Sequence, residues 1–68
     1  MAQEMDLLKQ SRELAESFIN GNISTVRKEL QGTKPPATAF RLYAMILDDL
    51  EYLSTIQVVN SFKRLMGK

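Results

Sequence analysis

The stretch FRLYAMILDDLEYL, residues 40–53, is apolar around an unusually large part of its circumference when it is drawn as a helix. Placing successive residues about 100° apart spreads its apolar side chains over an arc of about 200°, whereas a surface helix needs a stripe of about 100°. The arc contains Leu42, Leu53, Ile46, Leu50, Tyr43, Leu47, Phe40 and Ala44. Such a helix must contact more than one neighbour, which the remaining chain or a second subunit has to supply.

Three further helical patterns surround this segment, and turn residues separate them. Residues 3–20 carry one apolar stripe opposed by charged side chains, which predicts an amphipathic helix. It should end at Gly21, which can take the left-handed conformation that closes a helix, and Asn22 can then cap the next one. The second helix, residues 23–31, is short and should stop at Gly32.

The remaining boundaries follow from proline and from capping residues. Pro36 suits the first turn of the apolar helix, because its missing N–H would have no partner there. Ser54 and Gln57 have the spacing of a capping box, which predicts a fourth helix over residues 55–66. The junction at Leu53-Ser54 is either a true turn or a kink in one continuous helix.

These patterns predict one all-α domain over residues 1–68, a compact bundle of three longer helices and one short helix. The chain has no Cys and no His, so neither a disulfide nor a zinc site can support so small a fold. We expect the surplus apolar surface of residues 40–53 to be completed by a twofold homodimer. The predicted core is Leu7, Leu14, Phe18, Val26, Leu30, Phe40, Tyr43, Leu47, Leu50, Val59 and Phe62.

Catalytic and metal-binding chemistry is poorly represented in this sequence. The absence of His and Cys removes the commonest general base, the commonest soft nucleophile and most transition-metal ligands. Asp48 and Asp49 are neighbours on a helix and diverge by about 100°, so they do not converge easily on one ion or proton. We therefore expect no enzyme, no catalytic residue, no metal and no cofactor.

The features that remain indicate binding to another protein. Met45, Asp49 and Tyr52 are spaced four and three residues apart, so they share one stripe at the edge of the apolar arc. With Gln57 at the start of the fourth helix they combine adaptable apolar area, a charge and an aromatic ring, which is typical of interfaces. This profile is typical of small regulators or inhibitors that bind a larger protein, such as accessory proteins of phages and plasmids.

DNA binding of the helix-turn-helix type is the alternative function. The stretch LSTIQVVNSFKRLMG, residues 53–67, superficially resembles a recognition helix, but the preceding helix then places Asp48 and Asp49 where that motif wants small apolar residues. A second register uses Gly32 as the turn. A basic group near it could contact nucleic acid or an acidic partner, and it consists of Arg27, Lys28, Lys34 and Arg41.

Location is inferred from the absence of targeting patterns. The first ten residues, MAQEMDLLKQ, lack the basic-then-apolar layout of a signal peptide. No run approaches the ~20 apolar residues that span a bilayer, and the net charge of +1 is too small for strong attraction to anionic lipid. We expect a complete, cytoplasmic protein without a membrane partner.

Overall fold

Four helices follow one another in the predicted order within residues 2–67. The computed structural model describes the backbone of residues 2–67 and the side chains of residues 6–67. The helices are α1 (Ala2–Ile19), α2 (Ile23–Gly32), α3 (Pro36–Leu53) and α4 (Ile56–Met66). No strand occurs within residues 2–67, so the all-α expectation is confirmed.

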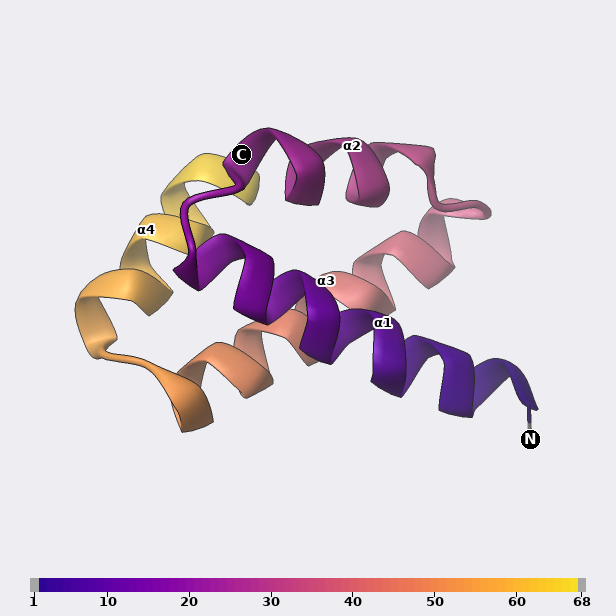
Figure 1. The fold of residues 1–68 in the computed structure, drawn as a ribbon. Helices are drawn as coiled ribbons and strands as arrows, with labels where there is room; N and C mark the ends of the chain where they lie inside the picture. Colours follow the sequence, from indigo (N-terminus) through magenta and orange to yellow (C-terminus); the bar gives the residue numbers. More distant parts are fainter. Residues whose placement is uncertain (1, 68) are drawn as a thin grey trace.

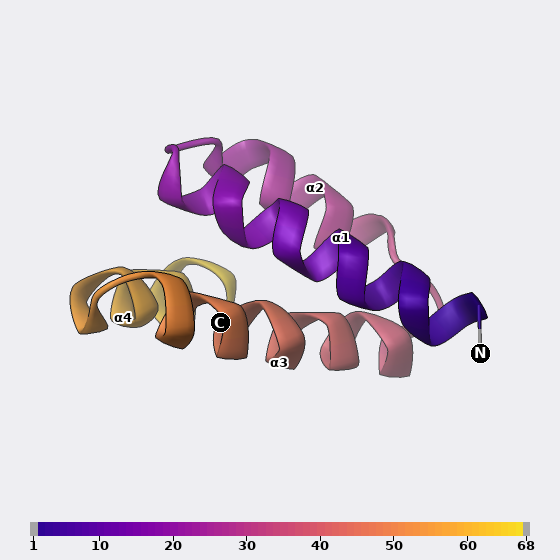
Figure 2. The same cartoon turned by 60° about the horizontal axis from the view of Figure 1, so that its bottom comes forward.

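The helices are arranged in two layers. α1 and α2 form an antiparallel hairpin, and α3 packs across this hairpin, mainly against α1 and also in contact with α2 (Figure 1). α4 folds back along α3, so α3 and α4 form the second layer (Figure 2). The face of this second layer that points away from α1 and α2 is covered by no other helix in the described part of the chain.

The end of α1 is closed by the glycine that the sequence predicts. Gly21 has φ 92°, and its N–H donates to the carbonyl of Phe18 at 3.0 Å. The N–H of Asn22 donates to the carbonyl of Ser17 at 2.8 Å. This pair of bonds is the Schellman motif, which uses a left-handed residue to satisfy the last carbonyls of a helix. Asn22 precedes α2 as predicted, but its side chain makes no capping hydrogen bond.

The junction between α3 and α4 is a turn, and its cap differs from the predicted one. Ser54 and Thr55 both have extended backbone, so α4 is a separate helix rather than a kinked continuation of α3. Thr55 is the N-cap, because its Oγ1 accepts a hydrogen bond from the N–H of Val58 at 3.4 Å. The Ser54 hydroxyl instead donates to the carbonyl of Leu50 at 2.7 Å, so the predicted capping box at Ser54 is wrong by one residue.

The core lies between the two layers and draws on every helix. Its buried apolar members are Leu7, Leu14, Ala15, Phe18, Val26, Leu42, Ile46, Leu50, Val59 and Phe62. α3 contributes one straight line of three residues at intervals of four, Leu42, Ile46 and Leu50, each 0% exposed. These three residues lie in one half of the 200° arc, so only that half faces the core.

The other half of the arc corrects the predicted core. Phe40 is 74% exposed, so its assignment to the core is wrong. Tyr43 and Leu47 are only partly buried, as is Leu30 on α2. Periodicity alone could not separate the two halves, because both are apolar and the choice depends on where α1 and α4 pack.

Phe62 joins the two layers at the centre of the core. It is 0% exposed, and its ring lies edge-on to Phe18 of α1 with centroids 5.3 Å apart. On its other side it stacks on Tyr43 of α3 at 5.0 Å, with 26° between the planes. Aromatic pairs prefer these edge-to-face and offset-stacked arrangements, so Phe62 fixes the position of α4 against both α1 and α3.

Candidate interaction surfaces

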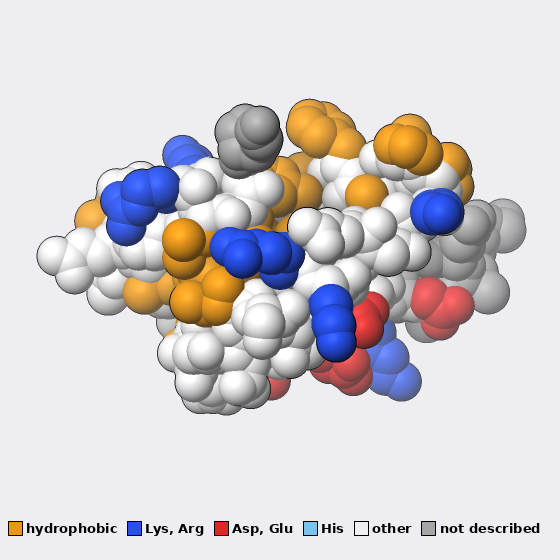
Figure 3. Space-filling model, turned by 90° about the horizontal axis from the view of Figure 1, so that it is seen from above, with side chains coloured by type: hydrophobic (Ala, Val, Ile, Leu, Met, Phe, Trp, Pro, Cys, Tyr) orange, Lys and Arg blue, Asp and Glu red, His pale blue; other side chains and the backbone are white. Residues whose placement is uncertain are grey.

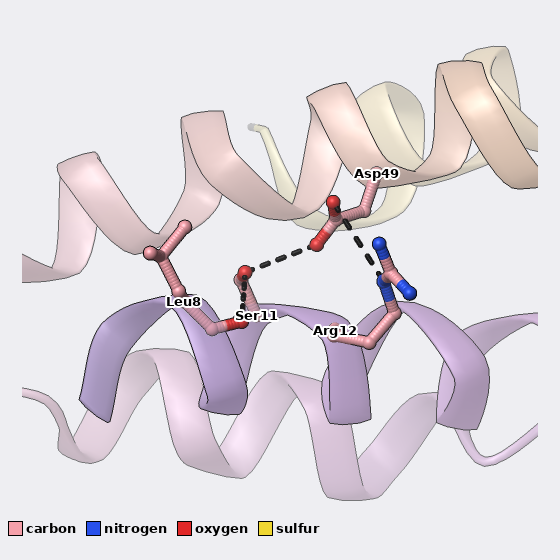
Figure 4. A network of polar contacts seen from close by, with 4 residues as sticks. All are labelled: Leu8, Ser11, Arg12 and Asp49. Carbon is pink, nitrogen blue, oxygen red and sulfur yellow. Dashed lines mark hydrogen bonds and ion pairs between the residues drawn. The ribbon is translucent and has the colours of Figure 1, made fainter. Parts of the chain in front are cut away.

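A small polar seam joins α1 to α3 and contains one of the predicted partner-binding residues. Ser11 is 1% exposed, and its Oγ lies 3.0 Å from Asp49 Oδ2 and 3.0 Å from the carbonyl oxygen of Leu8 (Figure 4). The hydroxyl has one hydrogen, so it donates to these two acceptors in turn. Arg12 Nε lies 3.9 Å from Asp49 Oδ1, on a side chain that is 51% exposed. Asp49 is therefore engaged inside the fold, where it fixes the crossing of α1 and α3.

The other members of the predicted partner-binding stripe differ in accessibility. Met45 is partly buried and packs against the core, whereas Tyr52 is 84% exposed. The structure thus keeps Met45, Asp49 and Tyr52 along one edge of α3 but leaves Tyr52 as its most accessible side chain. Gln57 is exposed and lines a groove that none of the other three lines.

That groove, which we call the Gln57 groove, lies where α1, α2 and α4 meet. It encloses about 330 Å³ and is lined by Phe18, Ile19, Ile23, Gln57, Val58, Ser61 and Leu65. None of these side chains is charged. Ile19 is 42% exposed and Leu65 is 40% exposed, so two large hydrophobic side chains of the groove already reach water.

A second groove lies on the other side of α4, and we call it the Tyr43 groove. It encloses about 510 Å³ and is lined by Leu30, Ala39, Phe40, Tyr43, Met66 and Gly67. The backbone of Gly67 lies close to the Tyr43 side chain. A larger residue at position 67 would not fit, because its Cβ would lie 2.7 Å from the Tyr43 hydroxyl and 2.6 Å from the Lys63 carbonyl oxygen. Seen from the α2 side, hydrophobic side chains reach the surface in separate groups, with Lys and Arg side chains between them (Figure 3).

The predicted basic group is divided among three segments. Arg27 of α2 reaches across to α4, where its Nη2 donates to the carbonyl of Leu65 at 3.4 Å. Lys28 is exposed on α2, Lys34 is exposed in the loop before α3, and Arg41 is exposed on α3. Arg27 therefore has a structural role that the sequence did not reveal, since a contact with a carbonyl 38 residues away leaves no sequence pattern.

Within the described residues, the His, Cys, Asp and Glu side chains form no group of three that could hold a metal ion. No helix in the same part of the chain is both long and apolar enough to cross a bilayer. Comparisons with protein-family models, with curated proteins and with solved structures found no match. The geometry of this chain is therefore the basis for any functional argument.

Sequence reasoning missed two features of these surfaces. Ser11 is the one buried polar side chain among the described residues, and it looks like an ordinary residue of an amphipathic helix. Ser11 lies four residues after Leu7 and four before Ala15, on the apolar face of the helix. This spacing could have indicated that Ser11 is buried. Phe40 carried no such signal, because its place on the arc is equally compatible with the core and with a surface.

Proposed function

We propose that this protein is a non-enzymatic module that binds another, larger protein and regulates or inhibits it, with the Gln57 groove as the binding site. The observation that carries this proposal is the lining of the groove, which has five large hydrophobic side chains and two neutral polar ones. A protein interface has a core depleted of charged residues, with polar groups that fix the register. The groove has this composition, and Gln57 and Ser61 provide its polar groups.

The position of the groove also supports binding to a protein. It lies at the junction of three helices, and Phe18, which lines it, packs edge-on against Phe62 and so joins α1 to α4 beside the groove. Apolar grooves between packed helices accept the side chains of a partner helix. The chain has neither His nor Cys for chemistry in the groove, which favours binding over catalysis. We place this activity in the cytoplasm.

The test is affinity capture from the native cell with two matched variants. Ser61→Arg introduces a long charged side chain into the groove, whereas Asn60→Arg introduces it on an exposed neighbour that does not line the groove. Both variants should keep the helical circular dichroism of the parent. We expect the parent and Asn60→Arg to retain the same protein, and Ser61→Arg to lose at least about tenfold in affinity for it.

Two outcomes would contradict the proposal. If Ser61→Arg is folded and binds the captured protein as tightly as Asn60→Arg does, the site lies elsewhere, and Tyr52→Ala is the next variant to test. If the parent retains a specific nucleic acid and no protein, DNA binding replaces the proposal. Duplex binding that survives about 200 mM salt would support that replacement, because a chain with net charge +1 should lose weak phosphate contacts there.

A further inference from the structure

The outer half of the α3 arc forms a surface stripe with the spacing of an interface helix. Phe40, Ala44, Leu47 and Glu51 follow one another at intervals of four, three and four residues. With about 100° per residue they fall within about 60° of each other, away from the buried line of Leu42, Ile46 and Leu50. Alternating intervals of three and four are the pattern by which one helix packs against another.

We infer that this stripe binds the same stripe of a second copy of the chain, with the two α3 helices antiparallel about a twofold axis. An axis midway between Ala44 and Leu47 places Ala44 of one copy opposite Leu47 of the other. The same axis places Phe40 opposite Glu51, whose aliphatic stem can lie against the ring. A small residue thus faces a large one at the centre, which lets the two backbones approach closely.

The charges beside the stripe select the antiparallel orientation. Arg41 and Asp48 lie seven residues apart, within about 20° of each other, on the same edge of the stripe. In the antiparallel pair, Asp48 of each copy lies about two residues, or roughly 3 Å along the axis, from Arg41 of the other. The Arg41 guanidinium has five N–H donors, so it can add this contact to those it makes within its own chain. A parallel pair would instead place the Arg41–Asp48 edge of one copy on the opposite side of the interface from that of the other, so these charges would not meet.

The Tyr43 groove provides a second contact in the same arrangement. Ile56 is 69% exposed and begins α4, and Gly67, eleven residues later on the same side of that helix, lines the groove. Because α4 runs back along α3, the twofold axis brings the start of α4 in one copy to the end of α4 in the other. Ile56 of each copy therefore faces the partner's Tyr43 groove, whose lining includes the apolar side chains of Leu30, Phe40 and Met66. The Gln57 groove lies on the opposite side of α4 and stays accessible in the dimer.

The first test is sedimentation over a range of concentrations. The parent should change from 7.8 kDa towards twice that mass as its concentration rises. Ala44→Glu places a charge at the centre of the stripe and should stay at the monomer mass, while the exposed Ser24→Glu on α2 should dimerise like the parent. A parent that stays at 7.8 kDa at high concentration, or a folded Ala44→Glu variant that dimerises like the parent, would overturn the inference.

A charge exchange tests the edge contacts. Arg41→Glu and Asp48→Arg should each raise the dimer dissociation constant about tenfold, and the double variant should recover most of the loss. Circular dichroism of each variant separates a loss of folding from a loss of association. A double variant that is folded but no tighter than the weaker single variant would exclude the Arg41–Asp48 contact and with it the antiparallel arrangement.

Cross-linking tests the orientation directly, because the natural chain has no Cys to interfere. A disulfide needs Cα atoms within about 7 Å, so an antiparallel pair should join Ala44→Cys to Leu47→Cys when the two variants are mixed and oxidised. Mass spectrometry distinguishes this mixed product from the product of either variant alone. If Ala44→Cys joins to itself more efficiently than to Leu47→Cys, the helices are parallel and the inference is wrong.

Discussion

Replacing Phe62 by Leu tests the aromatic centre of the fold, and Phe40→Leu is its matched control. Both wild-type residues were expected in the core, yet Phe62 is 0% exposed and Phe40 is 74% exposed. Phe62→Leu removes the edge-on contact with Phe18 and the stack on Tyr43, each worth ~0.5–1.5 kcal/mol beyond area burial. Phe62→Leu should therefore lower the free energy of unfolding by about 1–3 kcal/mol. Phe40→Leu, at an exposed position, should change the free energy of unfolding by less than about 0.5 kcal/mol.

These magnitudes can be measured by urea denaturation. A chain of this length is stable by about 3–10 kcal/mol, so the predicted loss is a large fraction of the total and is readily measured. With a denaturant slope of about 1 kcal/mol per molar urea, its midpoint should drop by about 1–3 M. The measurement needs a protein concentration at which the chain is monomeric, so that a dimer contact of Phe40 does not contribute. Equal losses for the two variants would refute the assignment of Phe62 to the core and Phe40 to the surface.

The turns and the polar seam give three further predictions, all measured by the same denaturation. Gly21→Ala should cost about 1–2 kcal/mol because Gly21 has a left-handed backbone with φ 92°. Gly32→Ala should not destabilise the fold, because a Cβ at Gly32 would have no neighbouring atom within 4 Å. Thr55→Ala should cost about 0.5–2 kcal/mol by removing the cap of α4, unlike the exposed Thr25→Ala. Ser11→Ala should cost about 1 kcal/mol by removing the hydrogen bond that the Ser11 hydroxyl donates to Asp49, whereas Ser24→Ala at an exposed position should not.

Local signals predicted the helices well, because each boundary depends on nearby chemistry. Gly21 and Pro36 act through their own backbone conformations, so their effects can be read without knowing what packs nearby. The cap of α4 was displaced by one residue because Ser54 and Thr55 are both good capping residues. Thr55 becomes the cap because the Ser54 hydroxyl already donates to the Leu50 carbonyl at the end of α3. This hydrogen bond depends on where α3 ends, which the sequence of the cap alone does not show.

Tertiary contacts set the limits of prediction for the core and for the surfaces. The apolar arc of α3 shows that the helix has more than one apolar side but not which side the rest of the chain covers. Asp49 illustrates the same limit of prediction. It lies on one edge of α3 with Met45 and Tyr52, as predicted, but its carboxylate accepts a hydrogen bond from Ser11 of α1. A residue 38 positions away cannot be identified from the periodicity of one helix.

The two halves of the α3 arc can be separated by substituting the neighbours Ile46 and Leu47. The sequence assigned Leu47 to the core, where truncation to Ala would cost ~2–5 kcal/mol. Ile46 is instead 0% exposed, whereas Leu47 is partly buried and belongs to the outer stripe. Ile46→Ala should therefore carry the cost of ~2–5 kcal/mol in the monomer. Leu47→Ala should cost clearly less, because part of its side chain stays in water.

Association should show the opposite order. Leu47 faces Ala44 of the second copy in the proposed dimer, so Leu47→Ala should weaken dimerisation by about tenfold or more. Ile46→Ala should leave the dimer contacts intact under conditions where the variant is folded, since its side chain does not reach the stripe. Denaturation at low concentration and sedimentation at high concentration measure the two effects on the same samples. If Leu47→Ala destabilises the monomer as much as Ile46→Ala and leaves association unchanged, the outer half of the arc belongs to the core and cannot form an interface.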